Sequence, residues 1–430
     1  MEMKKAFLSG WRREGLCRFL FAACEKEWER MSKIKRAYHY RFVPTDEQKT
    51  MLARTFGCCR YIYNWALNLK SASYRETGKS PGFAALCAML PALKTQPETA
   101  WLAEVSSVPL QQSLRHLDRA FVNFFAGRAS YPAFKKKHGP QSVTYTAAAF
   151  TWKDGQLTLA KTDGPLAIRW SRPLPDGATP STVTISRDAV GRYFVSLLLE
   201  EEITPLPVSP ERIGIDLGLT ALVSTSGGEK VDNPKYLAQE EKKLARAQKR
   251  HAKKRKGSRN REKARRRVAR IHARIRDKRR DYQHQLSTRL IRENQVICVE
   301  SLAVKNMLQH PTLVKAIADV GWGEFLRQLE YKAQWYGRTL IKIDRWYPSS
   351  KTCSVCGEVL ASLELDVREW TCRQCGTHHD RDLNAARSFL AEGLRVYAAG
   401  LAVSACGGDV RPNLDGIREG SLQGSRNPHS

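Results

Sequence analysis

Three acidic residues occur where structural elements are expected to end or begin. A short apolar run leads into Asp216, and a second apolar run, 296–299, leads into Glu300. Asp382 lies at the expected entry of a helix in the segment 379–390. One acid at the end of a strand is usually a turn or capping residue, so the indication comes from all three together.

Two central strands and a helix could bring these three carboxylates together as oxygen ligands for hard divalent cations. Two such cations, about 3.5–4 Å apart, activate a water molecule and stabilise the leaving oxygen of a phosphodiester. The pattern therefore predicts a catalytic centre for phosphodiester hydrolysis, built from Asp216, Glu300 and Asp382 with Mg²⁺ or Mn²⁺.

Four of the eleven cysteines have the spacing of metal ligands. Cys353 and Cys356 form one pair, and Cys372 and Cys375 form a second pair after fifteen intervening residues. Four thiolates at this spacing are typical of a closed, structural zinc ribbon. His378 and His379 are rival ligands, but the cysteines already complete a tetrahedral shell. Four buried cysteines without a metal are the less favoured alternative.

The charge of the chain indicates a nucleic-acid partner. Its 430 residues include 72 Lys+Arg and 43 Asp+Glu, a net charge of +29. Such an excess favours binding to polyanions. An anionic membrane is the competing partner, but no run of about 18 apolar residues exists, so we expect no membrane association.

The most basic segment is Asn233–Arg280, with 22 Lys/Arg and four Asp/Glu, which is +18 of the total. Gly257-Ser258 in its middle predicts two basic helices joined by a turn. A solvated charge run is the alternative, but like charges at this density repel one another unless a polyanion neutralises them. The candidate phosphate-binding residues are Lys253, Lys254, Arg255, Lys256, Arg265, Arg266 and Arg267.

The length predicts two to four structural units, and a hydrophobic fraction of 42% is that of a folded protein. Residues 35–43 alternate as a strand does, and Thr45 is expected to cap a helix that starts a largely helical stretch up to Phe125. Between residues 143 and 199, short apolar runs and Gly/Pro turns predict a small antiparallel barrel or sheet. The helical stretch would then be an insertion into this β-structure.

The first residues do not have the pattern of a signal peptide, because the apolar run is interrupted at residues 11–14, which are Trp11, Arg12, Arg13 and Glu14. Eleven cysteines in a chain without an export signal also favour a reducing compartment. We therefore expect a cytoplasmic protein. Residues 1–32 are interpreted as an N-terminal extension, and Met31 is an alternative start.

Three C-terminal motifs resemble a known family. They are WYPSSKTCSVCG at 346–357, REWTCRQCG at 368–376 and HDRDLNAA at 379–386. They resemble the C-terminal block of TnpB, the OrfB-type protein of bacterial insertion sequences, which is considered ancestral to the type V CRISPR effectors. The resemblance begins at about Lys33 and includes the segments 59–64, 132–137, 214–218, 330–333 and 405–412.

The resemblance implies a multidomain α/β architecture: an oligonucleotide-binding wedge β-barrel with a helical insertion, and an RNase H-like RuvC domain interrupted by a zinc ribbon. The implied boundaries are 1–32 for the extension, 33–45 and 130–207 for the wedge barrel, 46–129 for the recognition lobe, 211–352 and 376–402 for RuvC, 353–375 for the ribbon, and 403–430 for a tail.

The resemblance further implies an RNA-guided DNA endonuclease of a bacterial cell, associated with the nucleoid through DNA. Such a protein binds a guide RNA derived from the transposon end, recognises a short adjacent DNA motif, and cleaves guide-matched double- and single-stranded DNA. Asp216, Glu300 and Asp382 match the three RuvC acids. Ser301 and the pair Arg387-Ser388 depart from common family residues, but neither departure removes an expected metal ligand.

Two other functions are compatible with parts of the sequence. A non-cutting RNA-guided DNA-binding regulator need not keep the three acids. A stand-alone RuvC-like, structure-specific nuclease explains the acids and the ribbon, but it leaves the basic helices without a task. RNA that copurifies with the protein would distinguish the last two classes.

Overall fold

The computed structural model describes residues 33–202, 205–364 and 366–405, which form two compact units. The first comprises the described part of Met1–Ile203 together with Lys243–Arg274, and the second comprises the rest. The predicted extension, 1–32, and most of the predicted tail, 403–430, lie outside the described residues. Among the described helices, none combines the length and the apolarity needed to cross a membrane.

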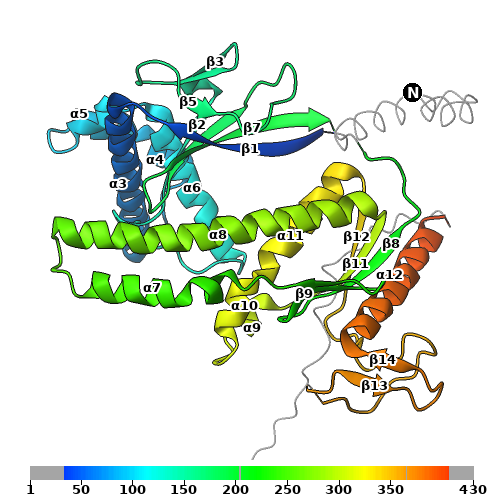
Figure 1. The fold of residues 1–430 in the computed structure, drawn as a ribbon. Coiled ribbons are helices and arrows are strands. Elements are labelled where there is room, and N and C mark those ends of the chain that lie inside the picture. Colours follow the sequence, from blue (N-terminus) through cyan, green and yellow to red (C-terminus); the bar gives the residue numbers. More distant parts are fainter. Residues whose placement is uncertain (1–32, 203–204, 365, 406–430) are drawn as a thin grey trace, which may run out of the picture. The chain divides into compact units, whose positions relative to one another are not determined.

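The first unit contains a five-stranded antiparallel sheet with the order β2-β6-β7-β1-β5 (Figure 1). The strand predicted at 35–43 is confirmed as β1 (Lys33–Val43), which pairs with β7 (Tyr193–Glu202) over ten residues. Tyr38, Tyr40 and Phe42 alternate along β1 and are all buried. The remaining strands of the sheet are β2 (Gln141–Thr146), β5 (Ala167–Arg169) and β6 (Thr182–Arg187). A separate hairpin consists of β3 (Phe150–Lys153) and β4 (Gln156–Leu159), and the short 3₁₀ helix η2 (Ala147–Ala149) precedes it.

Four α-helices and one 3₁₀ helix of this unit lie between β1 and β2 in the chain, as predicted for an insertion. The longest is α3 (Asp46–Thr77), and its predicted cap at Thr45 is confirmed by a capping box with Gln48. Leu52 and Ile62 on α3 are fully buried in the core of the unit, and each such burial stabilises the fold by about 1.5–3 kcal/mol. The other helices are α4 (Phe83–Ala88), α5 (Leu90–Thr95), η1 (Ala100–Glu104) and α6 (Ser107–Phe125).

The two predicted basic helices are confirmed as α7 (Tyr236–Ala252) and α8 (Arg259–Glu293). Gly257 lies in the turn between them with φ +82°, a left-handed conformation that favours glycine. Near the turn, Arg261 donates a hydrogen bond to the Lys254 carbonyl. At the opposite end, the ring of Tyr236 lies 6.4 Å from that of Tyr282. The two helices therefore form an antiparallel hairpin (Figure 1).

The second unit contains a mixed five-stranded sheet with the order β10-β9-β8-β11-β12. β8 (Arg212–Asp216), β11 (Val296–Glu300) and β12 (Thr339–Ile343) are parallel neighbours, whereas β9 (Ala221–Thr225) folds back on β8. β10 (Lys230–Asp232) forms the edge. The helices are α9 (Val304–Met307), α10 (Val314–Val320), α11 (Trp322–Tyr336) and α12 (Arg381–Ala405), with the short hairpin β13 (Glu369–Thr371) and β14 (His378–Asp380) before α12.

Two glycines allow α12 to approach the sheet closely. A side chain at Gly214 in β8 would collide with the backbone carbonyl of Ala386 in α12. A side chain at Gly393 in α12 would collide with Cys298 in β11. Because interiors are close-packed, no space is left to absorb an added methyl group. These contacts fix the helix, and with it Asp382, over the strands that carry the other two acids.

Candidate active site and metal centre

Asp216 and Glu300 are the last residues of the adjacent parallel strands β8 and β11, as predicted. The register pairs Val299 with Ile215, so the two carboxylates emerge at the same edge of the sheet. The apolar residues before them, such as Ile215 and Val299, are fully buried and hold both strand ends in place. Asp382 lies in the first turn of α12, as predicted.

Asp216 lies close enough to the other two acids to feel their charges, although among the described residues only the four cysteines bring their ligand atoms within 4.8 Å of one another. Burial, and next the negative charges of Glu300 and Asp382, raise the pKa of Asp216 well above its ordinary value. The charges of Arg381 and Lys230 oppose this shift. Burial raises the pKa of Glu300 to about 7, opposed by a hydrogen bond with the backbone of Leu217. In the metal-free protein both shifts therefore favour the protonated form of these two acids.

Two cationic residues that we did not predict lie beside Asp382. Lys230 in β10 contacts Asp380 at 2.7 Å and lies 3.8 Å from Asp382. Arg368 lies 3.8 Å from the other carboxylate oxygen of Asp382. Asp380 in turn accepts hydrogen bonds from the backbone N–H of Asp382 (3.1 Å) and of Leu383 (3.0 Å), which caps α12. An acid at a helix N-terminus is stabilised by the orphan N–H groups and the helix dipole.

The four predicted zinc ligands come together. Their sulfur atoms all lie within 4.8 Å of one another. The distances from Cys353 to Cys375 and from Cys356 to Cys372 are both 3.6 Å. A tetrahedral zinc with Zn–S bonds of about 2.3 Å requires sulfur atoms roughly 3.8 Å apart. The donor set and its spacing therefore fit a structural zinc site.

The two rival histidines have other partners. The Nε2 atom of His379 lies 3.1 Å from the Cys353 sulfur, and its ring packs on Trp370 at 4.6 Å. His378 is exposed and lies beside Glu369. Each CxxC turn is closed by a left-handed glycine after the second cysteine, Gly357 (φ +82°) and Gly376 (φ +71°). His379 therefore neighbours the thiolates rather than joining the group of four.

Asn384 joins the cysteine turns to the helix that carries Asp382. It is 1% exposed. Its amide donates to the carbonyls of Thr352 (2.7 Å) and Ser349 (3.2 Å), and its carbonyl accepts from the Ser354 backbone N–H (2.9 Å). Asn384 thus hydrogen-bonds to the residue before and the residue after Cys353. No local pattern in the sequence assigned a role to this residue, because its partners lie about thirty residues earlier in the chain.

The seven basic candidates all lie on the α7–α8 hairpin, in two different settings. Lys253, Lys254, Arg255 and Lys256 are exposed at its tip. Among the described residues, none of these four side chains forms an ion pair with an acid. Arg265 and Arg266 contact Glu262 at 2.7 and 3.2 Å, whereas Arg267 is exposed on the same helix. The hydrogen bond from Arg265 is the main reason that the pKa of Glu262 is lowered to about 2.

Comparison with known proteins gives the context of these sites. A protein of Streptomyces pristinaespiralis named "Putative RNA-guided DNA endonuclease" is 53% identical over 399 residues, which covers 93% of this chain and 97% of the relative. The chain belongs to the TnpB family. InsQ of Escherichia coli K12, a second family member with the same name, is 30% identical and covers 86% of this chain and 94% of its own length.

Family models match three separate regions of the chain. The probable transposase model of the OrfB type matches residues 195–310, and the TNB domain model of Cas12f1-like proteins matches 322–389. A helix-turn-helix model of the same OrfB family matches 31–79. In the described part of that region, the chain forms one strand, β1, and one helix of 32 residues, α3.

A solved structure shares the fold of this TnpB-family chain. The cryo-EM structure of a Cas12f1–sgRNA–target DNA complex has a TM-score of 0.53 at 12% identity, and the match covers 83% of this chain and 99% of the Cas12f1 chain. The fold class predicted from the resemblance, a mixed α/β protein with a zinc-ribbon-like cysteine cluster, is thus confirmed at this level.

Proposed function

We propose that this protein is an RNA-guided DNA endonuclease and that Asp216, Glu300 and Asp382 form its one cleavage centre. The observation that carries this assignment is the position of Asp216 and Glu300 at the ends of adjacent parallel strands, together with the pKa of Asp216, which is raised by burial and by the charges of Glu300 and Asp382. The names of two relatives, which both include the words RNA-guided DNA endonuclease, indicate a guide RNA and DNA as the partners.

The acids fit divalent cations because carboxylate oxygens are the preferred ligands of Mg²⁺ and Mn²⁺. When bound, such cations activate water and stabilise the leaving oxygen of the scissile phosphodiester. The chain's own part is to hold Asp216 and Glu300 on two rigid strands and Asp382 on a capped helix. Lys230 and Arg368 place positive charge beside Asp382, where an anionic DNA backbone would approach.

We further propose the domain assignment implied by the family: a wedge barrel at 33–45 and 130–207, a recognition lobe at 46–129, a RuvC domain at 211–352 and 376–402, and a zinc ribbon at 353–375. The five-stranded sheet with its helical insertion and the cysteine hairpin support it. The zinc has four thiolate ligands and no open position, so its role is structural. The exposed basic tip of α7–α8 is proposed to bind phosphates.

The test begins with the RNA that copurifies with the protein. We expect a defined RNA, and replacing its guide portion should move the cut to a DNA site that matches the new guide. DNA binding without cutting would identify a guided regulator instead. Cutting that ignores the guide would identify a stand-alone nuclease.

A further inference from the structure

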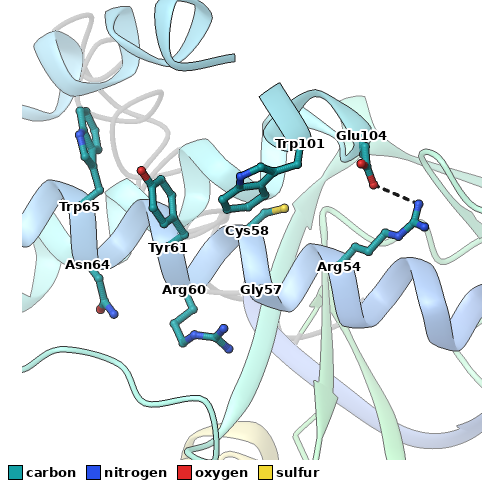
Figure 2. A pocket seen from close by; sticks show the side chains of 9 residues that line it. All are labelled: Arg54, Gly57, Cys58, Arg60, Tyr61, Asn64, Trp65, Trp101 and Glu104. Carbon is teal, nitrogen blue, oxygen red and sulfur yellow. Dashed lines mark ion pairs between the residues drawn. The ribbon is translucent and has the colours of Figure 1, made fainter. Parts of the chain in front are cut away.

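An open hollow of about 730 Å³ lies on α3, beside η1, within the first unit. Its lining includes Tyr61, Trp65 and Trp101 as well as Arg54 and Arg60. Figure 2 shows the three aromatic side chains in a row along one side of α3, with Arg60 reaching toward the opposite edge. The volume is within the range of small-ligand sites, roughly 300–1,000 Å³.

The aromatic faces are held in place. Trp101 is 38% exposed, and its indole N–H donates to the Glu98 carbonyl at 2.9 Å. Its ring meets Tyr61 edge-on, with the centroids 5.0 Å apart. Tyr61 and Trp65 also pack against the hydrophobic core of the unit. A stacking partner would therefore meet a preformed surface and would not have to order it.

Gly57, which also lines the hollow, is not required by packing. It lies inside α3, where glycine costs roughly 0.5–1 kcal/mol relative to alanine. A Cβ atom at this position would meet no protein atom within 4 Å. A larger side chain at this position would therefore extend into the hollow without meeting the rest of the described chain. Gly57 is thus a suitable position for filling the hollow by substitution.

The charges identify the kind of ligand. Arg54 forms a 3.0 Å ion pair with Glu104, which leaves Arg60 as the lining cation that pairs with no acid among the described residues. An apolar peptide would desolvate Arg60 without pairing it. A nucleotide offers a π-face for the indole ring and a phosphate for the guanidinium group, the usual chemistry of single-strand binding.

We propose that this hollow binds one unpaired nucleotide, with the base stacked on Trp101 and the phosphate paired with Arg60. The proposal rests on the proposed function, because the nucleotide would come from the guide RNA or from the DNA. Both sources offer the same base and phosphate, so the experiment has one arm for each.

The first experiment maps contacts by photo-crosslinking in the assembled complex. One arm uses guide RNA containing 4-thiouridine, and the other uses target DNA containing 4-thiothymidine. We expect one arm to give crosslinked peptides at Trp101 or Tyr61. Crosslinks confined to other parts of the chain in both arms would overturn the proposal.

The second experiment fills the hollow without weakening the helix. Gly57→Leu should reduce binding of the strand identified by crosslinking on the order of 10-fold, the usual effect of losing one stacked base, with an unchanged or higher midpoint of thermal unfolding. Trp101→Leu should have a similar effect on binding. Wild-type affinity in both variants would overturn the proposal.

The matched controls are two residues outside the hollow. Gly323→Leu replaces another helical glycine with open space around it, and Tyr74→Leu removes an exposed aromatic ring from the same helix α3. Both should bind as the wild type does. Guided cleavage by the wild type and by Gly323→Leu, measured in the same reactions, tests the proposed function separately, because binding at the hollow does not require cleavage.

Discussion

The buried charge of Glu300 should make the stability of the metal-free protein fall as pH rises. Burial raises its pKa from 4.5 to about 7, so the native state keeps the proton more tightly than the unfolded chain does. Below pH 4.5 both states are protonated and no penalty exists. Between pH 4.5 and 7 the unfolded chain ionises first, so the free energy of unfolding decreases. Above pH 7 the full penalty remains.

The size of the effect follows from the shift. Each pKa unit corresponds to about 1.4 kcal/mol, so Glu300 contributes up to about 3 kcal/mol. For a unit of roughly 200 residues this is a decrease of about 6–12 °C in the unfolding midpoint. Asp216 acts in the same direction, because its pKa is also raised. A divalent cation bound to the ionised carboxylates should reverse the loss at pH 8 and have little effect at pH 5.

The assay compares the wild type with Glu300→Gln at pH 5, 6, 7 and 8, with and without Mg²⁺. Chelators are left out because they would remove zinc from the thiolates. Hydrogen exchange of the Val296–Glu300 amides follows the second unit directly, and the difference between the two proteins cancels the titration of other groups. We expect the variant to lose the share of the pH and Mg²⁺ dependence that Glu300 contributes and to keep the share of Asp216. Identical profiles for the two proteins would refute the reasoning.

Three further predictions concern the ribbon and the basic hairpin. Cys372→Ser should lower zinc content and cleavage and loosen the chain between Cys353 and Asp382, while guide RNA binding largely survives; a protein with one zinc and normal cutting would show that this cysteine is not a ligand. Asn384→Ala should retain zinc but cut more slowly, because each buried group left without a partner costs about 1–3 kcal/mol; unchanged exchange of the 349–354 amides would contradict this. The hairpin-tip variant replaces four residues with Gln, namely Lys253, Lys254, Arg255 and Lys256. It should reduce the slope of log affinity against log salt by up to about 3–4 units. An unchanged slope would show that the tip is only a solvated surface.

Local patterns in the sequence predicted much of the site. Apolar runs that end in an acid gave Asp216 and Glu300 their places at strand ends, because a buried strand can end in a polar residue only where it leaves the core. The paired spacing of the cysteines predicted their cluster, since two CxxC turns can enclose one metal. The cap at Thr45 and the turn at Gly257 were predicted from the same kind of local preference.

Other parts of the site depend on contacts between distant segments. Lys230 meets Asp380 across 150 residues of sequence, and Asn384 meets Thr352 across 32. The sequence shows Gly214 only as a glycine in a strand, and its need to be glycine comes from the close approach of α12. Such roles follow from the packing of the helix on the sheet, which short-range periodicity does not encode. The same holds for Gly57, which lines a hollow together with Trp101 from a different segment of the chain.

The most direct test of the cleavage centre is to assemble the protein with its guide RNA and measure both binding and cutting of a matched DNA in Mg²⁺. Asp216→Ala, Glu300→Ala and Asp382→Ala should each bind guide and target nearly as the wild type does, yet leave the DNA uncut, because each removes a metal ligand needed only for the chemistry. Full cutting by any of the three variants would exclude that residue from the centre and contradict the account.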